Sequence, residues 1–341
     1  MKNEKNVIVK KILKVFGRIL AALIGLGLIL WINHNICNLV ERRKLSIPGD
    51  KVEIYDGEFI SSVKIGKGKY TIVLLPGMGT ASPYYDYYNL ANLLSQYSQV
   101  VIIEPLGYGF SDNTLKVRNL DNYEYELNKV LNYYDIKENI ILLGHSYSGI
   151  QNLNYANKHN EVRGLVCLDC TTAYQIESHV KNNKFINEPP VYAKSLSLLS
   201  KLGLTRFVYG TFARNNIKKD LLSDIPLEYH SAYKYFLYNK TMNKTIINEL
   251  NGIPYNQLEL LHQKYNNNLH TITFLSDESV EEMKEYKKDG DFLKDWEEMH
   301  NLLISNESIQ KIYVLHGDHY IHHHNTKEIS DKIFEMINEL N

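Results

Sequence analysis

Apolar residues along this chain of 341 residues gather into short continuous runs. Four of these runs end in turn residues: "YTIVLLPGMG" (70–79), "VVIIEPLGYG" (100–109), "NIILLGHSYSG" (139–149) and "VRGLVCLDC" (162–170). Continuous Val, Ile and Leu runs of this length are typical of strands that are buried on both faces of a parallel sheet. Helix-length segments separate them at 84–96, 120–134 and 147–157. This alternation predicts a mostly parallel, doubly wound α/β sheet.

The pattern changes on both sides of this block. Before it, "KVEIYDGEFISSVKIG" (51–66) alternates and predicts an antiparallel strand pair at the sheet edge. After residue 171 the alternation stops, and residues 172–268 contain helix-like stretches without a convincing strand. Strand-like runs resume at 269–279 and 309–319, and a helix at 325–340 closes the chain. We therefore predict a core built from residues 45–171 and 269–341. A helical cap, 172–268, would cover the carboxyl edge of the sheet, where open α/β sheets bind ligands.

The first 44 residues have a different character. Six basic residues precede residues 19–40, a span that contains no Asp, Glu, Lys or Arg. About 20 mostly apolar residues suffice to cross a bilayer as a helix. Basic residues are more numerous before the span than after it, which predicts a cytoplasmic N-terminus and an extracytoplasmic domain from residue 45 onward. We expect residues 1–44 to be a basic segment with a membrane anchor. A cleaved signal peptide and a buried helix are the alternatives.

Composition narrows the choice of partners. The formal net charge is −1, so the chain lacks the basic character that nucleic-acid binding requires. Cys167 and Cys170 have a Cys-x-x-Cys spacing, but Cys167 lies inside an apolar run, so a core role is favoured over redox or metal chemistry.

The turn "GHSYSG" (144–149) is the first candidate for chemistry, because it places Ser146 between small residues at the end of a predicted strand. Small neighbours permit a sharp strand-to-helix turn that lifts a serine hydroxyl out of the sheet as a nucleophile. Ser148 occupies the place where the usual G-x-S-x-G pattern has its second glycine. An ordinary structural turn is the alternative for such a short motif.

A serine nucleophile needs a base, an acid that orients the base, and donors for an oxyanion. His319 lies just past the last predicted strand, and a loop there could bring its imidazole to Ser146. Asp277 follows the preceding strand and is our predicted acid, with Asp169 as its rival and Glu278 as a substitute. The backbone N–H groups of Met78 and Tyr147 are the predicted oxyanion donors. The five histidines between 316 and 324 could instead bind a metal, although no Glu or Cys set accompanies them.

Taken together, these motifs resemble the α/β-hydrolase fold family of serine hydrolases. "LLPGMGTASPYYDY", "IIEPLGYGFSD", "ILLGHSYSG", "FLSDES" and "HGDHYIHH" stand in the family's order, and the resemblance covers residues 52–340. It implies Ser146 as nucleophile, His319 as base and Asp277 as its acid, with Met78 and Tyr147 as oxyanion donors and no cofactor or metal. The family calls the strand-to-helix turn that carries the nucleophile the elbow, and here it is the turn 144–149. A serine at the elbow excludes relatives that use an aspartate nucleophile, such as haloalkane dehalogenases and epoxide hydrolases. Glu104 and Asp112 are expected to be structural.

The implied activity is hydrolysis of small-molecule or lipid-like carboxylic esters through an acyl-enzyme, as in carboxylesterases and lipases. An aminopeptidase or amidase and an acyltransferase use the same triad and stay as alternatives. A catalytically silent binding module of the same fold is the alternative from outside enzymology.

Overall fold

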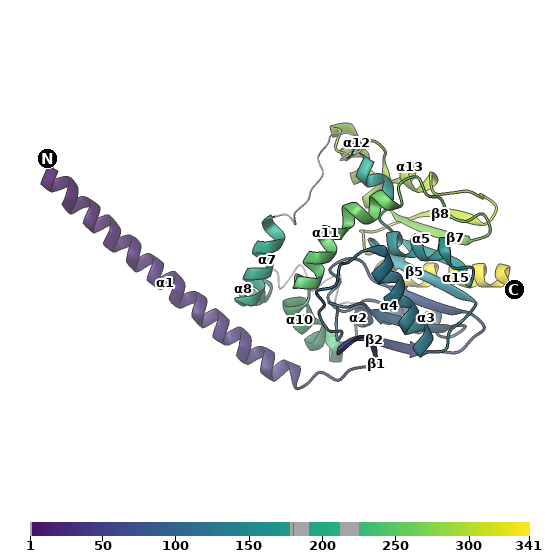
Figure 1. Cartoon of the computed structure of the whole chain (residues 1–341), viewed down its shortest axis with the longest axis horizontal. Coiled ribbons are helices and arrows are strands. Elements are labelled where there is room, and N and C mark those ends of the chain that lie inside the picture. Colours follow the sequence, from purple (N-terminus) through teal and green to yellow (C-terminus); the bar gives the residue numbers. More distant parts are fainter. Residues whose placement is uncertain (1, 178–179, 181–190, 212–224) are drawn as a thin grey trace.

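The computed structural model describes residues 2–177, 180, 191–211 and 225–341. An eight-stranded sheet lies at its centre (Figure 1). The strand order is β1-β2-β4-β3-β5-β6-β7-β8, with β2 antiparallel to β1 and β4 and all later neighbours parallel. The strands are β1 Asp50–Tyr55, β2 Glu58–Ile65, β3 Thr71–Leu75, β4 Gln99–Glu104, β5 Ile140–His145, β6 Val162–Leu168, β7 His270–Ser276 and β8 Gln310–Leu315. The predicted fold class is therefore confirmed, including the antiparallel edge pair.

Helices cover both faces of the sheet because neighbouring strand residues point to opposite sides. Val73 of β3 belongs to one apolar core, whereas Ile72 and Leu74 belong to the other. The first core includes side chains of α4 (Leu120–Tyr133), α5 (Ser148–Lys158), α12 (Asp277–Asp289) and α13 (Trp296–Asn301). The second includes α3 (Tyr88–Leu94) and α15 (Thr326–Leu340). The predicted helix 84–96 is two helices, α2 (Pro83–Asp86) and α3, because the backbone leaves helical geometry at Tyr87.

Among its described residues, the segment between β6 and β7 contains helices joined by turns and loops, and no strand. It contains η1 Ala173–Ile176, α7 Val191–Lys201, α8 Leu204–Thr211, η2 Leu227–Tyr229, α10 His230–Asn239 and α11 Lys244–Glu259. Residues 178–179, 181–190 and 212–224 of the predicted cap lie outside the described residues. In Figure 1, α7, α8 and α10 lie together on the side of the sheet domain that the N-terminal helix approaches.

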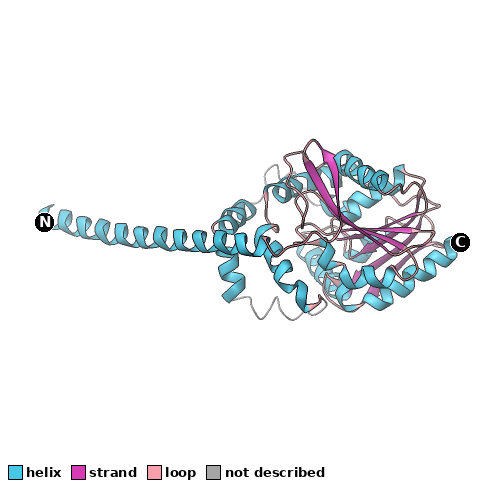
Figure 2. Cartoon of the chain, turned by 90° about the horizontal axis from the view of Figure 1, so that it is seen from below, coloured by secondary structure: helices cyan, strands magenta, loops and turns pink. Residues whose placement is uncertain are grey.

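The N-terminal helix α1 (Lys2–Arg42) extends away from the rest of the molecule (Figure 2). Its residues Lys10–Arg42 are long and apolar enough to cross a membrane, with a mean hydropathy of 2.3 in the most apolar window. None of that window is buried inside the protein, so this helix does not pack as a core helix of a soluble domain.

A buried ion pair ties the loop before α4 to that helix. Arg118 donates to both carboxylate oxygens of Glu126 over 2.5 and 2.9 Å, and both side chains are almost fully buried. Removing one partner leaves the other charge buried without compensation.

We predict that Arg118→Ala lowers the free energy of unfolding by about 3–5 kcal/mol. Urea denaturation in detergent, followed by tryptophan fluorescence, measures this change. Lys137→Ala is the matched control, because its ion pair with Asp135 is exposed and should leave the midpoint unchanged. Equal midpoints for the two variants would contradict the prediction.

Candidate active site

A strained turn at the end of β5 carries Ser146. Its φ angle is +51°, in a region that residues other than glycine rarely adopt, and α5 begins two residues later at Ser148. Backbone hydrogen bonds to the neighbouring strand hold the turn: the Ser146 N–H donates to Leu168 and the Thr171 N–H donates to Ser146. Strain of this kind persists only where the surrounding structure enforces it, and it clusters at functional sites.

The departure from the usual motif at Ser148 is accommodated by hydrogen bonding. The Ser148 hydroxyl is fully buried and lies 2.8 Å from the carbonyl oxygen of His145 and 3.0 Å from that of Leu75. Gly144 leaves room for it, because a Cβ at 144 would lie 2.6 Å from the Ser148 hydroxyl oxygen. A Cβ at Gly149 would similarly lie 2.5 Å from the buried, free Cys170. The elbow therefore tolerates serine at 148 but needs glycine at 144 and 149.

The loop after β3 packs directly against this turn. A Cβ at Gly77 would lie 3.1 Å from the Ser146 Cβ and 2.5 Å from the Nδ1 atom of His145. The next residue is Met78, one of the two predicted oxyanion donors. Among the described residues, neither the Met78 N–H nor the Tyr147 N–H has a hydrogen-bond acceptor.

His319 pairs with Asp169. Its Nδ1 atom donates to the Asp169 carboxylate over 2.7 Å. The carboxylate is completely buried and also accepts bonds from the Trp296 indole, the Ser279 hydroxyl and the Ser276 N–H. Burial alone would raise the pKa of Asp169, but the bonds from His319, Ser279 and Trp296 hold that pKa below its usual value. The buried carboxylate thus stays ionised and fixes the His319 proton on Nδ1.

The predicted pairing of Asp277 with His319 is wrong. Asp277 is the first residue of α12, and its carboxylate accepts from the Gly317 N–H at 3.0 Å and from the His316 Nδ1 at 2.8 Å. The helix starts directly at the end of β7, so this side chain meets the start of the loop after β8, before the loop reaches His319. Asp277 braces the loop, while Asp169, named as the rival, contacts the imidazole.

A second histidine holds the backbone of His319 close to the elbow. The buried His145, next to Ser146 in the chain, donates from Nε2 to the His319 carbonyl over 2.9 Å, and the two rings lie 4.6 Å apart. Burial pushes the pKa of His145 well below its usual value, so it acts as a neutral donor. Across the described part of the chain, Ser146 and His319 share no hydrogen bond. In ligand-free enzymes such bonds are often long and shorten only with substrate.

Comparison with protein-family models identifies the family to which this chain belongs. A model described as the alpha/beta hydrolase fold matches residues 70–340. The chain belongs to the alpha/beta hydrolase fold family.

A curated protein and several solved structures are similar to this chain. A curated relative, "Uncharacterized protein YbdG" of Bacillus subtilis (strain 168), is 26% identical over 243 residues, covering 70% of this chain and 72% of the relative. Among solved structures, a Vigna radiata epoxide hydrolase mutant has a TM-score of 0.61 at 15% identity, over 85% of this chain and 98% of that one. MenH from S. aureus has a TM-score of 0.57 at 15% identity, over 82% and 98%. At such identities the likeness shows the fold alone.

A polar network that the sequence analysis missed links α11, a helix of the predicted cap, to the loops at the sheet edge. Glu249 of α11 is buried and accepts hydroxyl bonds from Tyr108 and Tyr123, and Tyr108 in turn accepts from the Gly79 N–H of the loop after β3. Asn256 of the same helix donates to the Tyr147 hydroxyl over 2.6 Å. Burial raises the pKa of Glu249 despite the nearby Arg118. The cap helix therefore supports both segments that carry the predicted oxyanion donors.

Among the described residues, one cluster has the donor atoms of a metal site: Asp86, His322 and His323, with ligand atoms within 4.8 Å of one another. The two imidazoles already lie 3.2 and 3.1 Å from the two Asp86 oxygens. These hydrogen bonds attach α14 (Ile321–His324) to α2. Because α14 begins two residues after His319, they also hold the end of the His319 loop. They also place His322 and His323 in packing roles.

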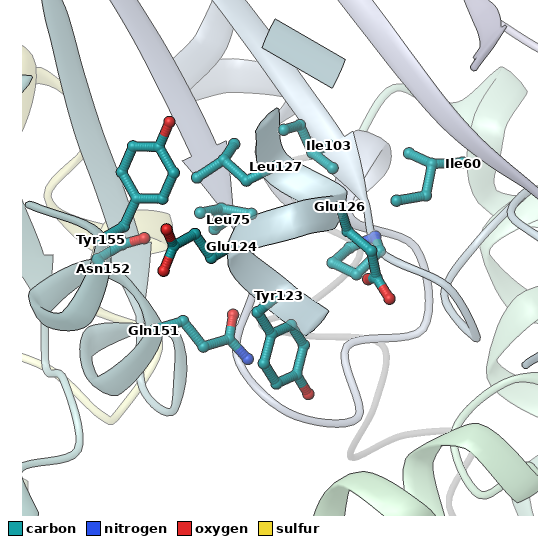
Figure 3. Close-up of a pocket in the computed structure, with 11 residues that line it drawn as sticks. Ile60, Leu75, Ile103, Tyr123, Glu124, Glu126, Leu127, Gln151, Asn152 and Tyr155 are labelled. Atoms are coloured by element: carbon teal, nitrogen blue, oxygen red, sulfur yellow. The ribbon is translucent and has the colours of Figure 1, made fainter. Parts of the chain in front are cut away.

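The cavity in Figure 3 is separate from the elbow. It lies between the sheet, α4 and α5. Its water-accessible volume is about 20 Å³, so it is too small for an organic substrate. Asn152 of α5 lines it, and neither amide atom of that side chain has a partner among the described residues. Neither Ser146 nor His319 contributes to its wall.

The contrast between the two acids gives a direct test. We predict that Asp169→Asn lowers kcat for an activated ester by about four orders of magnitude, because the amide no longer fixes the His319 tautomer. Asp277→Asn should retain kcat within about tenfold, since its contacts are exposed. Stopped-flow and steady-state assays with a p-nitrophenyl ester measure both, and circular dichroism checks folding. Loss of activity in Asp277→Asn with activity kept in Asp169→Asn would reverse the assignment.

Proposed function

We propose that this protein is a membrane-anchored serine hydrolase that cleaves carboxylic esters with a triad of Ser146, His319 and Asp169. The single observation that carries the proposal is the 2.7 Å bond from His319 Nδ1 to the buried Asp169, beside a serine held at φ +51°. An ordinary turn does not explain the convergence of these groups from three strand ends.

In the proposed reaction, Ser146 attacks the ester carbonyl while the free Nε2 of His319 takes the hydroxyl proton. The N–H groups of Met78 and Tyr147 bind the oxyanion. His319 then returns the proton to the leaving alcohol, and Asp169 stabilises the imidazolium between these steps. Water attacks the acyl-enzyme by the same sequence and releases the acid.

The nucleophile separates this proposal from epoxide opening. Several solved structures of similar fold are epoxide hydrolases. In the family that the sequence motifs resemble, epoxide hydrolases use an aspartate at this turn, whereas this chain has Ser146. An alkoxide nucleophile with oxyanion donors suits a carbonyl carbon.

We further propose that α1 anchors the enzyme, with residues 19–40 in the membrane, the N-terminus in the cytoplasm and the catalytic domain outside. The length and apolar character of Lys10–Arg42 support the span. The excess of basic residues before it supports the orientation.

We expect a fluorophosphonate probe to label the wild-type protein and to leave Ser146→Ala unlabelled, because the probe reacts only with an activated serine. Ser148→Ala is the control and should still be labelled.

A panel of p-nitrophenyl esters of rising chain length, beside aminoacyl anilides, then identifies the acyl group. Turnover of the anilides alone would overturn the esterase proposal. An unlabelled wild-type protein would favour a silent module.

The loop after β3 provides a second test. Gly77→Ala should lower kcat at least tenfold, since the new Cβ meets His145 and Ser146 and displaces the adjacent Met78 N–H. Met78→Ala keeps the backbone N–H and should retain most of kcat. Steady-state kinetics on one ester, with KM and kcat determined separately, compares the two. Equal losses in both variants would argue against a backbone donor at 78.

A further inference from the structure

Polar residues at the end of the anchor helix form a stripe that faces the cap. His34, Asn38 and Glu41 lie on one face of α1, at the spacing of successive helical turns. Arg206 of α8 donates to both Glu41 oxygens over 2.6 and 2.7 Å and to Asn38 Oδ1 over 2.7 Å. His34 is 5% exposed. The cap is therefore fastened to the anchor and not only to the catalytic domain.

Two further contacts complete this junction. Asn38 and Asn239 of α10 exchange side-chain hydrogen bonds of 2.9 and 3.0 Å. The turn before α8 touches α1 through its backbone, because a Cβ at Gly203 would lie 2.9 Å from the Leu30 carbonyl oxygen and 2.5 Å from the His34 Cβ. Gly203 has a φ of +77°, so both the close approach and the backbone geometry call for glycine.

The contact between Gly203 and Leu30 shows where along α1 the cap lies. Leu30 lies inside the uncharged stretch 19–40 of α1. The start of α8 is therefore level with residues of the proposed span, not with the linker that follows it. Figure 1 shows α8 next to α1, ahead of the point where that helix ends, and α7 packed on α8.

Apolar side chains of the helices on either side of Gly203 are exposed. Leu196 and Leu198 of α7, Leu202 of the turn and Val208 of α8 are 38–58% exposed. The exposed Lys201 lies among them. Apolar residues beside a basic one are typical of helices that lie in the interfacial plane of a membrane.

We propose that α7 and α8 dock into the outer leaflet beside α1, so that the cap faces the bilayer and the enzyme acts on esters of membrane lipids. The occupant of the apolar surface is lipid, because Leu202 directly precedes Gly203, which contacts α1 at Leu30 inside the apolar span. This inference rests on the proposed anchor and, for its substrate class, on the proposed esterase activity.

The test uses the full-length protein in vesicles of phosphatidylcholine and phosphatidylglycerol. In a Cys37→Ser background, a bimane label is placed by Leu198→Cys or Leu202→Cys, and quenching by lipids that carry a doxyl group near the headgroup is measured. Val314→Cys, 46% exposed on β8, is the matched control, and Leu23→Cys on α1 reports the anchor. Quenching at 198 and 202 should exceed that at 314 about threefold.

Quenching at 23 with control-level signals at 198 and 202 overturns the cap docking while leaving the anchor intact. Control-level signals at all sites overturn the anchor and, with it, this inference. A blue-shifted label at 198 that depends on protein concentration and not on doxyl lipid indicates a second copy as the occupant, which also overturns it. These readouts do not use catalysis, so failure of the esterase proposal is seen separately.

Activity then tests the substrate class. The double variant Leu198→Glu and Leu202→Glu should raise KM for a vesicle-borne lipid ester about tenfold, with kcat/KM for a soluble short-chain ester unchanged. Equal effects on both esters, or on neither, would refute the lipid-substrate class. Arg206→Ala should lower quenching at 198, since it releases α8 from α1.

Discussion

The buried carboxylate of Asp169 is the constraint around which this site is organised. An ionised group with no exposed surface is costly unless donors surround it. Here the donors come from four places: His319 in the loop after β8, Ser276 at the end of β7, Ser279 on α12 and Trp296 on α13. Satisfying one charge thus fixes the relative positions of the carboxyl ends of three adjacent parallel strands.

The position of Ser146, the proposed nucleophile, follows from the same strand ends. His145 of β5 pairs with Leu168 of β6, one residue before Asp169, so Ser146 and Asp169 leave the sheet side by side. Both Ser146 and Asp169 have positive φ angles, +51° and +44°. The sheet's hydrogen bonds hold these two strained turns together, and the His319 loop closes over them through its carbonyl bond to His145.

Sequence reasoning reached the sheet and Ser146 because both have strong local signals. The strand runs are continuous and apolar, and the elbow needs small residues at fixed offsets, as Gly144 and Gly149 show. It failed at the acid because Asp169 and Asp277 both follow parallel strands at the same edge. Which one reaches an imidazole depends on the turn after each strand: Asp169 leaves β6 in a left-handed turn, whereas Asp277 is already in a helix. No periodicity encodes that difference.

Hydrogen bonds between residues distant in sequence could not be predicted from the sequence either. Asp86 meets His322 and His323 across more than 230 positions, and Glu249 meets Tyr108 across 141. In the proposed anchor, contacts distant in sequence explain polar residues that look unfavourable when the sequence is considered alone. His34 and Asn38 weaken the span when the sequence is read alone, because polar side chains disfavour a lipid environment. In the proposed anchored state, the bonds of Asn38 to Arg206 and Asn239 remove that conflict, since α8 and α10 and not lipid contact that side of the helix. Polar residues that look unfavourable in the proposed membrane helix thus bind α8 and α10 to it.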